Sequence, residues 1–585
     1  MKNTSITITI YLIVVLTQCF GISKTANCST TEEVIRKQEQ IQRSDDDQRR
    51  EAEKRHKTIQ KRPQRKIEIE TPGHAETPPA EGICVQIEII RFTGATLLSE
   101  SDTARLSAPY SGRCLGMNEI NELVRDVTNL YIARGYVTTR VSVPVQDLAS
   151  GNLEIRVVEG TVEDIRLNDN SWVDKRRVAM TFPGVKIGDP LNLRDIEQGV
   201  ERMNRLPSSD ARVRIEPGAR PGTSIVVIED RPDKSWRAVV GLDNSGQEST
   251  GRTKCTASLA VDNPTGLNDM LTLSASGDAK ALAGLSRPAS HGLSGYYSVP
   301  YGPWTVTGSA SFSEYRARLD GGGARYLSSG ETTVWGLDVN RVLHRSEESA
   351  TSAGLNLNVK DVDNYLEHER LVAGSYNLSV LGVSLEHSQS LFGGRLDLRA
   401  GYDIGLPVLG ARRDTTTARS VPKAEFQKIH ASGGWDRHVD AGFRPLTFST
   451  RASGQWSPDT LYNSERLDLG GRHTVRGFQR ESLAGDNGGY VRNEVSIPLL
   501  PKNSLPLDLA TTLGEPRLYA GYDAGFIHWD KHDAYERGVL QGAALGLRTS
   551  GGFLDTDLCL SKPLAAPSFM NNRDWEFYWS FSSNF

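Results

Sequence analysis

The segment WTVTGSASF, Trp304–Phe312, alternates between mostly apolar and hydroxyl-bearing side chains. Successive side chains of a β-strand point to opposite faces, so this segment predicts a strand with one apolar and one polar face. The alternation returns in RLDLRAGYDIG, Arg395–Gly405, where the polar positions are largely charged, and in FYWSFSSNF, Phe577–Phe585. We therefore expect strands of this kind from residue 233 to residue 585.

The number of these strands favours one closed barrel over a soluble sandwich, which also alternates. About 350 residues, at about 22 per strand and connection, allow about 16 strands, an even number that suits a bacterial outer-membrane barrel with a polar lumen. At about this number the lumen is wide enough to hold water. The terminal aromatic strand, with Phe581 and Phe585, resembles the signal by which such barrels are recognised for insertion. We predict a transmembrane β-barrel of about 16 antiparallel strands at residues 233–585.

Residues 1–23 have the pattern of a secretory signal peptide, with Lys2, an apolar run at 6–16 and small residues at 21–23. The run is too short to cross a bilayer, and a buried N-terminal helix or strand is the alternative. No later run of about 18 apolar residues predicts a membrane helix. The net charge of -4 on 585 residues argues against nucleic acid as the main partner.

Residues 30–60 are rich in Glu, Gln, Arg and Lys, which favour a helix, but their apolar residues form no continuous stripe. A helix that is polar all round must be surrounded by water or by polar walls, and a disordered charged arm is the alternative. Residues 61–83 are rich in proline and charge and predict an extended linker.

Two α/β modules follow, at residues 84–160 and 161–232. Each pattern predicts a strand, an amphipathic helix and two closing strands, and the period of about 75 residues indicates a tandem repeat. Export permits a disulfide between Cys84 and Cys114 in the first module. The remaining cysteines have no metal-ligand spacing, so we expect no metal site and no cofactor.

The segment LGGRHTVRGF, Leu469–Phe478, places Arg476 in a glycine-rich loop. In RLYAGYDAGF, Arg517–Phe526, the alternation turns Asp523 toward the lumen, with glycine two residues away on each side. A guanidinium matches a half-buried carboxylate with two parallel hydrogen bonds. We predict that the loop folds into the barrel and docks Arg476 on Asp523. The alternative is that Arg476 and Asp523 are both solvated and do not meet. Asp403, in the segment AGYDIG, has a local sequence of the same form as that of Asp523 and is a second candidate partner.

With these residues the chain resembles the outer-membrane exporters of two-partner secretion, the B components that export filamentous haemagglutinins, haemolysins and contact-dependent inhibition (CDI) toxins. The specific motif is Val475-Arg476-Gly477-Phe478, at the tip of the long sixth extracellular loop of that family. Its partner is the strand motif with Gly521, Asp523 and Gly525. The family places the partner strand after the loop, which favours Asp523 over Asp403.

This resemblance implies the domain order and the partners. It implies a plug helix at 30–60, a linker at 61–83, two POTRA domains at 84–160 and 161–232, a barrel at 233–585, and a first-module disulfide between Cys84 and Cys114. It implies an outer-membrane protein with periplasmic POTRA domains that secretes a large unfolded exoprotein, the A component, without ATP. Other expected partners are outer-membrane lipid and, during biogenesis, the barrel assembly machinery.

Three other functions remain to be separated from secretion. An assembly factor that inserts other barrels belongs to the same superfamily, and the two-module pattern favours secretion over it. An enzyme is disfavoured because the sequence has no G-x-S-x-G or H-E-x-x-H motif. A passive porin is disfavoured because porins carry no periplasmic modules.

Overall fold

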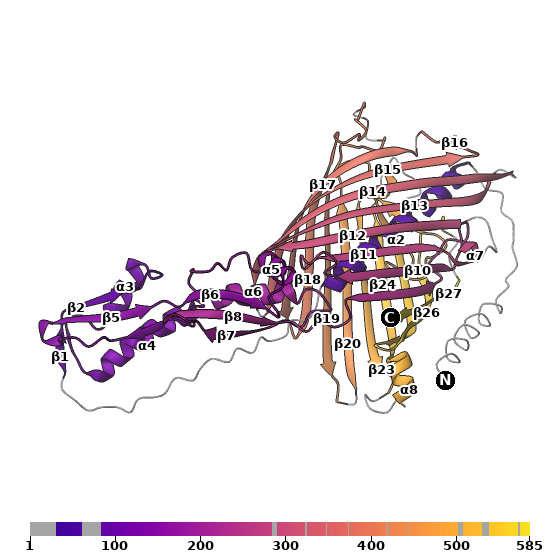
Figure 1. Cartoon of the computed structure of the whole chain (residues 1–585). Helices are drawn as coiled ribbons and strands as arrows, with labels where there is room; N and C mark the ends of the chain where they lie inside the picture. The colour runs from indigo at the N-terminus through magenta and orange to yellow at the C-terminus, as the bar shows by residue number, and fades with distance from the viewer. Residues whose placement is uncertain are drawn as a thin grey trace.

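The computed structural model of the full chain describes residues 31–60 and 84–585, apart from gaps at 283–288, 322–323, 347, 373, 417, 419, 443, 501–506, 529–536 and 571–573. The signal peptide expected at 1–23 and the linker expected at 61–83 lie outside the described residues. The described parts form a closed barrel, two small α/β domains that extend from one end of it, and one long helix inside it (Figure 1).

The barrel wall is a closed antiparallel sheet of 16 strands, which confirms the predicted fold class. The strands are β9 (Trp236–Asp243), β10 (Lys254–Asp262), β11 (Met270–Asp278), β12 (Ala289–Tyr301), β13 (Trp304–Gly321), β14 (Ala324–Arg345), β15 (Ser349–Leu366), β17 (Tyr376–Leu391), β18 (Gly394–Leu406), β19 (Gln427–Asp440), β20 (Pro445–Trp456), β23 (Gly488–Pro498), β24 (Glu515–Ile527), β25 (Gly538–Ser550), β26 (Leu554–Ala565) and β27 (Glu576–Asn584). Strand β27 pairs with β9 and closes the barrel. Short elements between them are β16 (Glu369–Arg370), α7 (Ala279–Leu282) and α8 (Leu507–Leu513).

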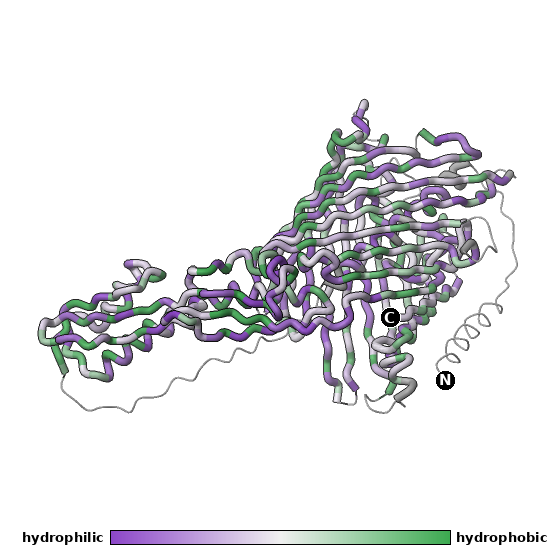
Figure 2. The backbone as a smooth tube through the Cα atoms, in the orientation of Figure 1, coloured by the Kyte–Doolittle hydropathy of each residue, from purple (hydrophilic) through white to green (hydrophobic). Residues whose placement is uncertain are grey.

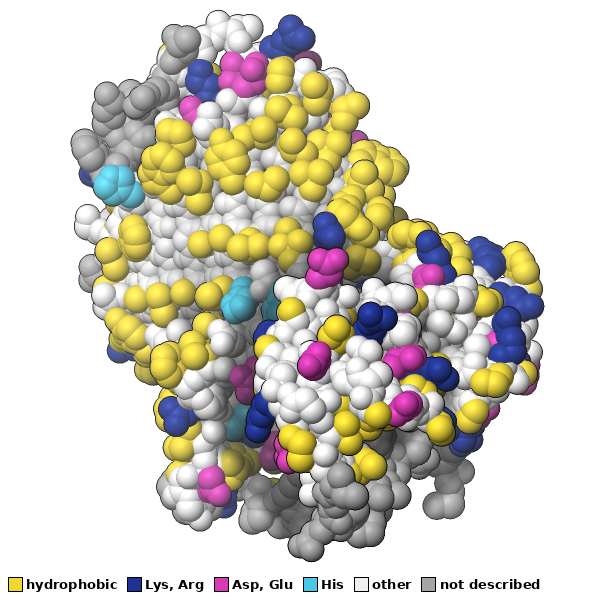
Figure 3. Space-filling view, turned by 90° about the vertical axis from the view of Figure 1, so that its left-hand side faces the viewer, with side chains coloured by type: hydrophobic (Ala, Val, Ile, Leu, Met, Phe, Trp, Pro, Cys, Tyr) yellow, Lys and Arg dark blue, Asp and Glu magenta, His cyan; other side chains and the backbone are white. Residues whose placement is uncertain are grey.

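The alternation predicted from the sequence separates the two faces of the wall. On β13, Trp304 and Val306 are exposed on the outer surface, whereas Thr305 and Thr307 line the interior cavity. Figure 2 shows polar and apolar residues alternating along the strands, and Figure 3 shows rows of hydrophobic side chains on the outside of the barrel. A wall with this distribution presents an apolar surface to lipid and a polar surface to water.

None of the helices in the described residues is long and apolar enough to cross a membrane.

The first module folds as β1 (Val85–Ile87), β2 (Ile89–Thr93), α3 (Glu100–Ser107), β3 (Arg113–Leu115), α4 (Met117–Ala133), β4 (Arg140–Ser142), the 3₁₀ turn η1 (Leu148–Ser150) and β5 (Asn152–Val158). The second folds as β6 (Thr161–Leu167), α5 (Trp172–Thr181), α6 (Leu193–Met203), β7 (Arg212–Pro217) and β8 (Thr223–Glu229). Their main sheets have the orders β2-β5-β4 and β6-β8-β7. In each module the predicted amphipathic helix, α4 or α6, buries its apolar face against the sheet.

The sequence-based plan of one helix per module is incomplete, because each module contains a second helix, α3 or α5. Both begin with a capping box: Ser99 with Asp102 in α3, and Ser171 with Asp174 in α5. A capping box satisfies backbone donors that the first turn of a helix leaves free, so short helices with weak apolar periodicity are stabilised at that end.

The second module is tied to one rim of the barrel by buried polar contacts. Arg177 of α5 lies 2.5 Å from Asp230 and donates from Nε to Asn268 in the β10–β11 turn at 2.9 Å. The backbone N–H of Ser208 donates to Asp262 at 2.9 Å. These bonds place the second module at the β10–β11 turn, and the resemblance to two-partner exporters implies that this rim faces the periplasm.

Helix α2, Thr31–Gln60, lies within the barrel (Figure 1). Gln38 donates to Tyr315 at 3.2 Å, and His56 lies 3.0 Å from Thr272 and stacks on Tyr296. Since Tyr315 is far along β13 from the periplasmic rim and Thr272 is close to that rim, the helix runs along the lumen. The residues predicted to form a polar helix are therefore ordered inside the lumen, where polar groups of the wall contact them and Ile41 packs against Ala317 and Leu319.

Candidate functional site

The candidate site is a long loop, residues 457–487, which connects β20 to β23 at the rim opposite the two α/β modules and folds back into the lumen. We call it the inserted loop. Its stem is a short hairpin of β21 (Leu467–Leu469) and β22 (Leu483–Gly485). Its tip carries Arg476, whose side chain is only 1% exposed.

Arg476 meets Asp523 of β24 with two side-chain hydrogen bonds. Nε donates to Oδ2 at 2.6 Å and Nη2 donates to Oδ1 at 2.8 Å. The backbone N–H of Arg476 also donates to Oδ2 at 3.1 Å. The carboxylate is 0% exposed, so the guanidinium and the backbone N–H satisfy a charge that would be costly to bury alone. The structure brings together the pair that the sequence analysis had placed together.

Glycines make room for this contact on two neighbouring strands. A Cβ at position 521 would clash with Nη2 of Arg476, and one at position 525 would lie 3.1 Å from Cγ2 of Val475. On β25, a Cβ at position 542 would clash with the backbone oxygen of Arg476. The sequence motif includes the first two glycines, but Gly542 was not anticipated.

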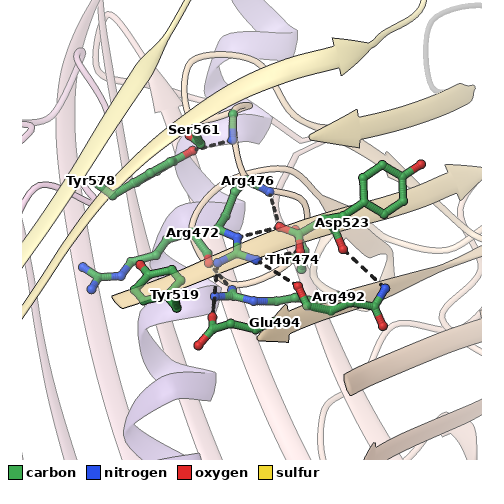
Figure 4. A network of polar contacts seen from close by, with 12 residues as sticks. Arg472, Thr474, Arg476, Arg492, Glu494, Tyr519, Asp523, Ser561 and Tyr578 are labelled. Atoms are coloured by element: carbon green, nitrogen blue, oxygen red, sulfur yellow. Dashed lines mark hydrogen bonds and ion pairs between the residues drawn. The ribbon is translucent and has the colours of Figure 1, made fainter. Parts of the chain in front are cut away.

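A wider set of charges surrounds the pair. Nη1 of Arg476 donates to Glu494 of β23 at 3.3 Å, and Arg548 of β25 binds the same carboxylate at 2.9 Å. Arg492 lies 3.8 Å from Glu494 and donates to the backbone oxygen of Arg472. Figure 4 shows Arg472, Arg476, Arg492, Glu494 and Asp523 of this network, together with Tyr519 and Tyr578. The sequence analysis missed these residues, since lumen-facing charges on separate strands carry no local motif.

The rest of the tip motif is also buried. Val475 and Phe478 are 0% exposed and pack in an apolar cluster with Leu469 and Leu540. Gly477 has a φ of 97°, which favours glycine, and its N–H donates to the hydroxyl of Tyr578 on β27 at 3.2 Å. The tip is thus fixed by a charged contact on one side and by apolar packing on the other.

Asp403, the alternative partner, lies elsewhere on the wall. On β18 it is 3.6 Å from Lys428 and 3.3 Å from His430, both on β19. Its local sequence resembles that of Asp523, but the structure gives it other partners.

The remaining predicted residues lie outside this site. Cys84 and Cys114 form a disulfide in the first α/β module, with Cα atoms 5.3 Å apart. Phe581 lies on β27 opposite Thr556 and Leu242. Phe585 follows that strand, is half exposed and packs edge to face with Phe553.

A second buried charge cluster, which the sequence analysis missed, fixes the base of the inserted loop. Glu465 is 3% exposed and contacts Lys360 of β15, and its Oε2 lies 2.7 Å from Nζ of Lys428 on β19. Single lysines in alternating strands have the pattern of ordinary lumen residues. No sequence signal pairs them with a loop glutamate 37 or 105 residues away.

Comparisons with known proteins agree with this architecture. The family model for the haemolysin secretion/activation protein ShlB/FhaC/HecB matches residues 222–549, and two POTRA models match residues 85–160 and 161–217. The outer membrane transporter CdiB of Escherichia coli is 35% identical over 509 residues, covering 87% of this chain and 84% of the relative. The hemolysin transporter protein ShlB of Serratia marcescens is 33% identical, covering 77% of each.

A solved structure of CdiB from Escherichia coli has a TM-score of 0.76 and 33% identity, covering 96% of this chain and 100% of that one. CdiB from Acinetobacter baumannii, at 22% identity and a TM-score of 0.70, shares the fold. The chain therefore belongs to the haemolysin secretion/activation protein family, whose members are outer-membrane transporters with periplasmic POTRA domains.

Proposed function

We propose that this transporter secretes one large unfolded exoprotein, which is an adhesin, a haemolysin or a toxin of contact-dependent inhibition. We also propose that the contact between Arg476 and Asp523 keeps the pore in the conformation that transports this client. The observation that carries the proposal is that contact itself. A wide polar barrel contains a loop whose tip is bound by a buried bidentate pair rather than left in solvent.

The lumen offers a hydrated path beside the plug helix and the inserted loop. A cavity of about 1610 Å³ runs through it. Hydroxyl and amide side chains line much of it, including Ser309, Ser311, Asn356 and Asn358. Such groups form hydrogen bonds to a passing backbone that exchange readily with those of water. Charged side chains of both signs, among them Asp397 and Arg399, also line the cavity.

Transport on this proposal begins at the POTRA domains. The client adds a strand to an exposed sheet edge or fills a helix–strand groove, the two modes by which such domains hold extended segments. Helix α2 then leaves the lumen and the client enters it. The sequence contains no Gly-rich phosphate cradle, so the driving force is the folding of the client outside the cell.

The role of Arg476 is structural within this cycle. The loop passes through the lumen, so its position decides the width and shape of the path. If the guanidinium of Arg476 left Asp523, the buried carboxylate would lose its compensating charge. The free-energy cost of that uncompensated charge strongly disfavours departure of the loop. The tip motif Val475–Phe478 and the glycines of the partner strand are therefore proposed as the working site.

The remaining partners follow from the surface. Lipid solvates the outer apolar rows, and the barrel assembly machinery recognises the terminal strand with Phe581 and Phe585. We propose no catalytic activity, on the ground that the sequence lacks the hydrolase and metalloprotease motifs considered above.

The test is a clean deletion of this protein in its native host, with two readouts. Quantitative proteomics of the culture medium and cell surface is expected to show the loss of one very large exoprotein, restored by the wild-type chain. The levels of unrelated outer-membrane barrels are expected to stay unchanged. A general fall in those barrels, without loss of a particular exoprotein, would overturn the proposal in favour of an assembly factor.

A further inference from the structure

The turn formed by η2, Asn463–Glu465, lies at the base of the inserted loop and has two faces. One face is held by the barrel wall through Glu465. The other contacts helix α2. This arrangement bears on how the plug is retained, which the proposed function requires but does not explain.

On the wall side, Glu465 joins strands that are distant in the sequence. Its carboxylate contacts Lys360 of β15 and lies 2.7 Å from Nζ of Lys428 on β19. Its backbone oxygen accepts a hydrogen bond from Gln455 of β20 at 2.9 Å. Lys360 and Lys428 are 7% and 8% exposed, so both cations need compensation, which Glu465 gives to both, Asp46 of α2 to Lys360 and Asp403 to Lys428.

On the plug side, the two preceding residues make four hydrogen bonds to α2. Nε of Arg43 donates to Oδ1 of Asn463 at 3.0 Å. Nδ2 of Asn463 donates to the backbone oxygen of Glu39 at 3.0 Å and to Gln42 at 3.3 Å. Nη2 of Arg50 donates to the backbone oxygen of Ser464 at 3.1 Å. These contacts span more than two turns of the helix.

The two faces are coupled because they belong to consecutive residues. The N–H of Ser464 donates to the hydroxyl of Tyr376 at 3.3 Å, and the ring of Tyr376 packs on Tyr462 at 4.3 Å between centroids. The turn therefore has few ways to move while Glu465 stays in place. Once the carboxylate loses its hold on the two lysines, Asn463 no longer presents its amide at the position that α2 requires.

We propose that Glu465 is a positioning residue for the plug: it fixes the turn on which α2 docks and so sets how long the plug stays in the lumen. The proposal rests on the proposed function for its biological meaning. It is separate from the seat of Arg476, because the two clusters share no residue and lie on different strands.

The test uses the purified full chain without a client. The variants are Glu465→Gln, which keeps the size of the side chain, Asn463→Ala, which removes plug contacts but no buried charge, and the control Glu386→Gln. Glu386 of β17 pairs with Arg399 of β18 at 3.2 Å on the same inner wall. Insertion is checked by heat-modifiable migration of the barrel.

Plug occupancy is measured in two ways. One is the open fraction of single channels in planar bilayers. The other is the cross-linking yield of Ile41→Cys with Ala317→Cys in a chain without Cys28, Cys255 and Cys559. Ile41 and Ala317 lie in one buried cluster, and neither residue makes one of the hydrogen bonds to the turn described above. Glu465→Gln and Asn463→Ala are both expected to raise the open fraction and lower the yield severalfold, whereas Glu386→Gln matches the wild type.

Unchanged occupancy in an inserted Glu465→Gln barrel overturns the proposal. A change in Glu465→Gln alone, with Asn463→Ala like the wild type, also overturns it, because the effect then does not pass through the docking turn. If Glu465→Gln does not insert, unchanged occupancy in Asn463→Ala is sufficient to reject the idea. Secretion of the client by the wild-type chain is measured separately, so a failure of the proposed function is not mistaken for a failure of this inference.

Discussion

Two buried charge clusters tie the same inserted loop to different parts of the barrel wall. At the tip, Arg476 meets Asp523 of β24 through a planar fork, with Glu494 as a further acceptor. At the base, Glu465 lies between two lysines on β15 and β19. The tip places the cation on the loop and the main acid on the wall, whereas the base reverses the charges.

The difference in chemistry indicates a difference in role. A guanidinium fork matches one carboxylate in one orientation, so the tip contact defines where the loop lies. A carboxylate between two ammonium groups on flexible stems defines a position less strictly but joins two strands to one turn. We infer that the tip cluster controls the shape of the pore and that the base cluster controls the plug.

The largest effect is expected for Arg476→Ala. Removing one partner of a buried pair costs about 3–5 kcal/mol, so the population of the seated loop falls by at least about a hundredfold. Secretion of the exoprotein, measured by immunoblot of the medium, is expected to be abolished while the barrel still inserts. The control is Arg451→Ala, which removes a more exposed lumen arginine 2.6 Å from Asp436. Normal secretion by Arg476→Ala would show that the tip cluster does not control the shape of the pore.

A smaller but clear loss is expected for Gly521→Ala. The added methyl group would clash with Nη2 of Arg476 without removing any charge. The guanidinium must then shift and lose part of its bidentate geometry, so secretion is expected to fall severalfold, as followed in a time course of release. Gly308→Ala is the matched control, because a Cβ there meets nothing within 4 Å. Equal secretion by the two alanine variants would contradict a role for close packing at the tip.

The smallest effect is expected for Asp403→Asn. Lys428 keeps Glu465 at 2.7 Å when Asp403 loses its charge, so the base cluster survives. Secretion is expected to stay within about twofold of the wild type, because the buried Lys428 keeps the nearer of its two carboxylates, that of Glu465. Asp523→Asn, assayed beside it, is expected to resemble Arg476→Ala. A reversed order of these two variants would assign the decisive acid to Asp403.

Local patterns at the tip suggested that Arg476 meets an inward-pointing aspartate, but Asp403 has the same pattern, and only the family resemblance favoured Asp523. Asp523 has glycine two residues away on each side, and Arg476 lies in a glycine-rich loop. The base cluster could not be predicted in this way. Lys360, Lys428 and Glu465 come together only through the closure of the barrel, which no local period encodes.

The two α/β modules also contain elements that apolar periodicity alone did not predict. Helices α4 and α6 were predicted from their apolar stripes, whereas α3 and α5 were missed. The first turns of the missed helices did carry a signal, the Ser-x-x-Asp capping boxes at Ser99 and Ser171. A search for caps as well as for periodicity would have found both helices.

The central claim is that Arg476 keeps the loop seated inside the barrel. The most direct measurement is the rate of disulfide formation between Val475→Cys and Leu540→Cys in intact cells, in a chain without Cys28, Cys255 and Cys559. Val475 and Leu540 belong to one buried apolar cluster, and this pair leaves the glycines of the site in place. With Arg476 present, rapid cross-linking is expected, and with Arg476→Ala the rate is expected to fall severalfold. Equal rates in both chains, or no cross-link when Arg476 is present, would contradict the account.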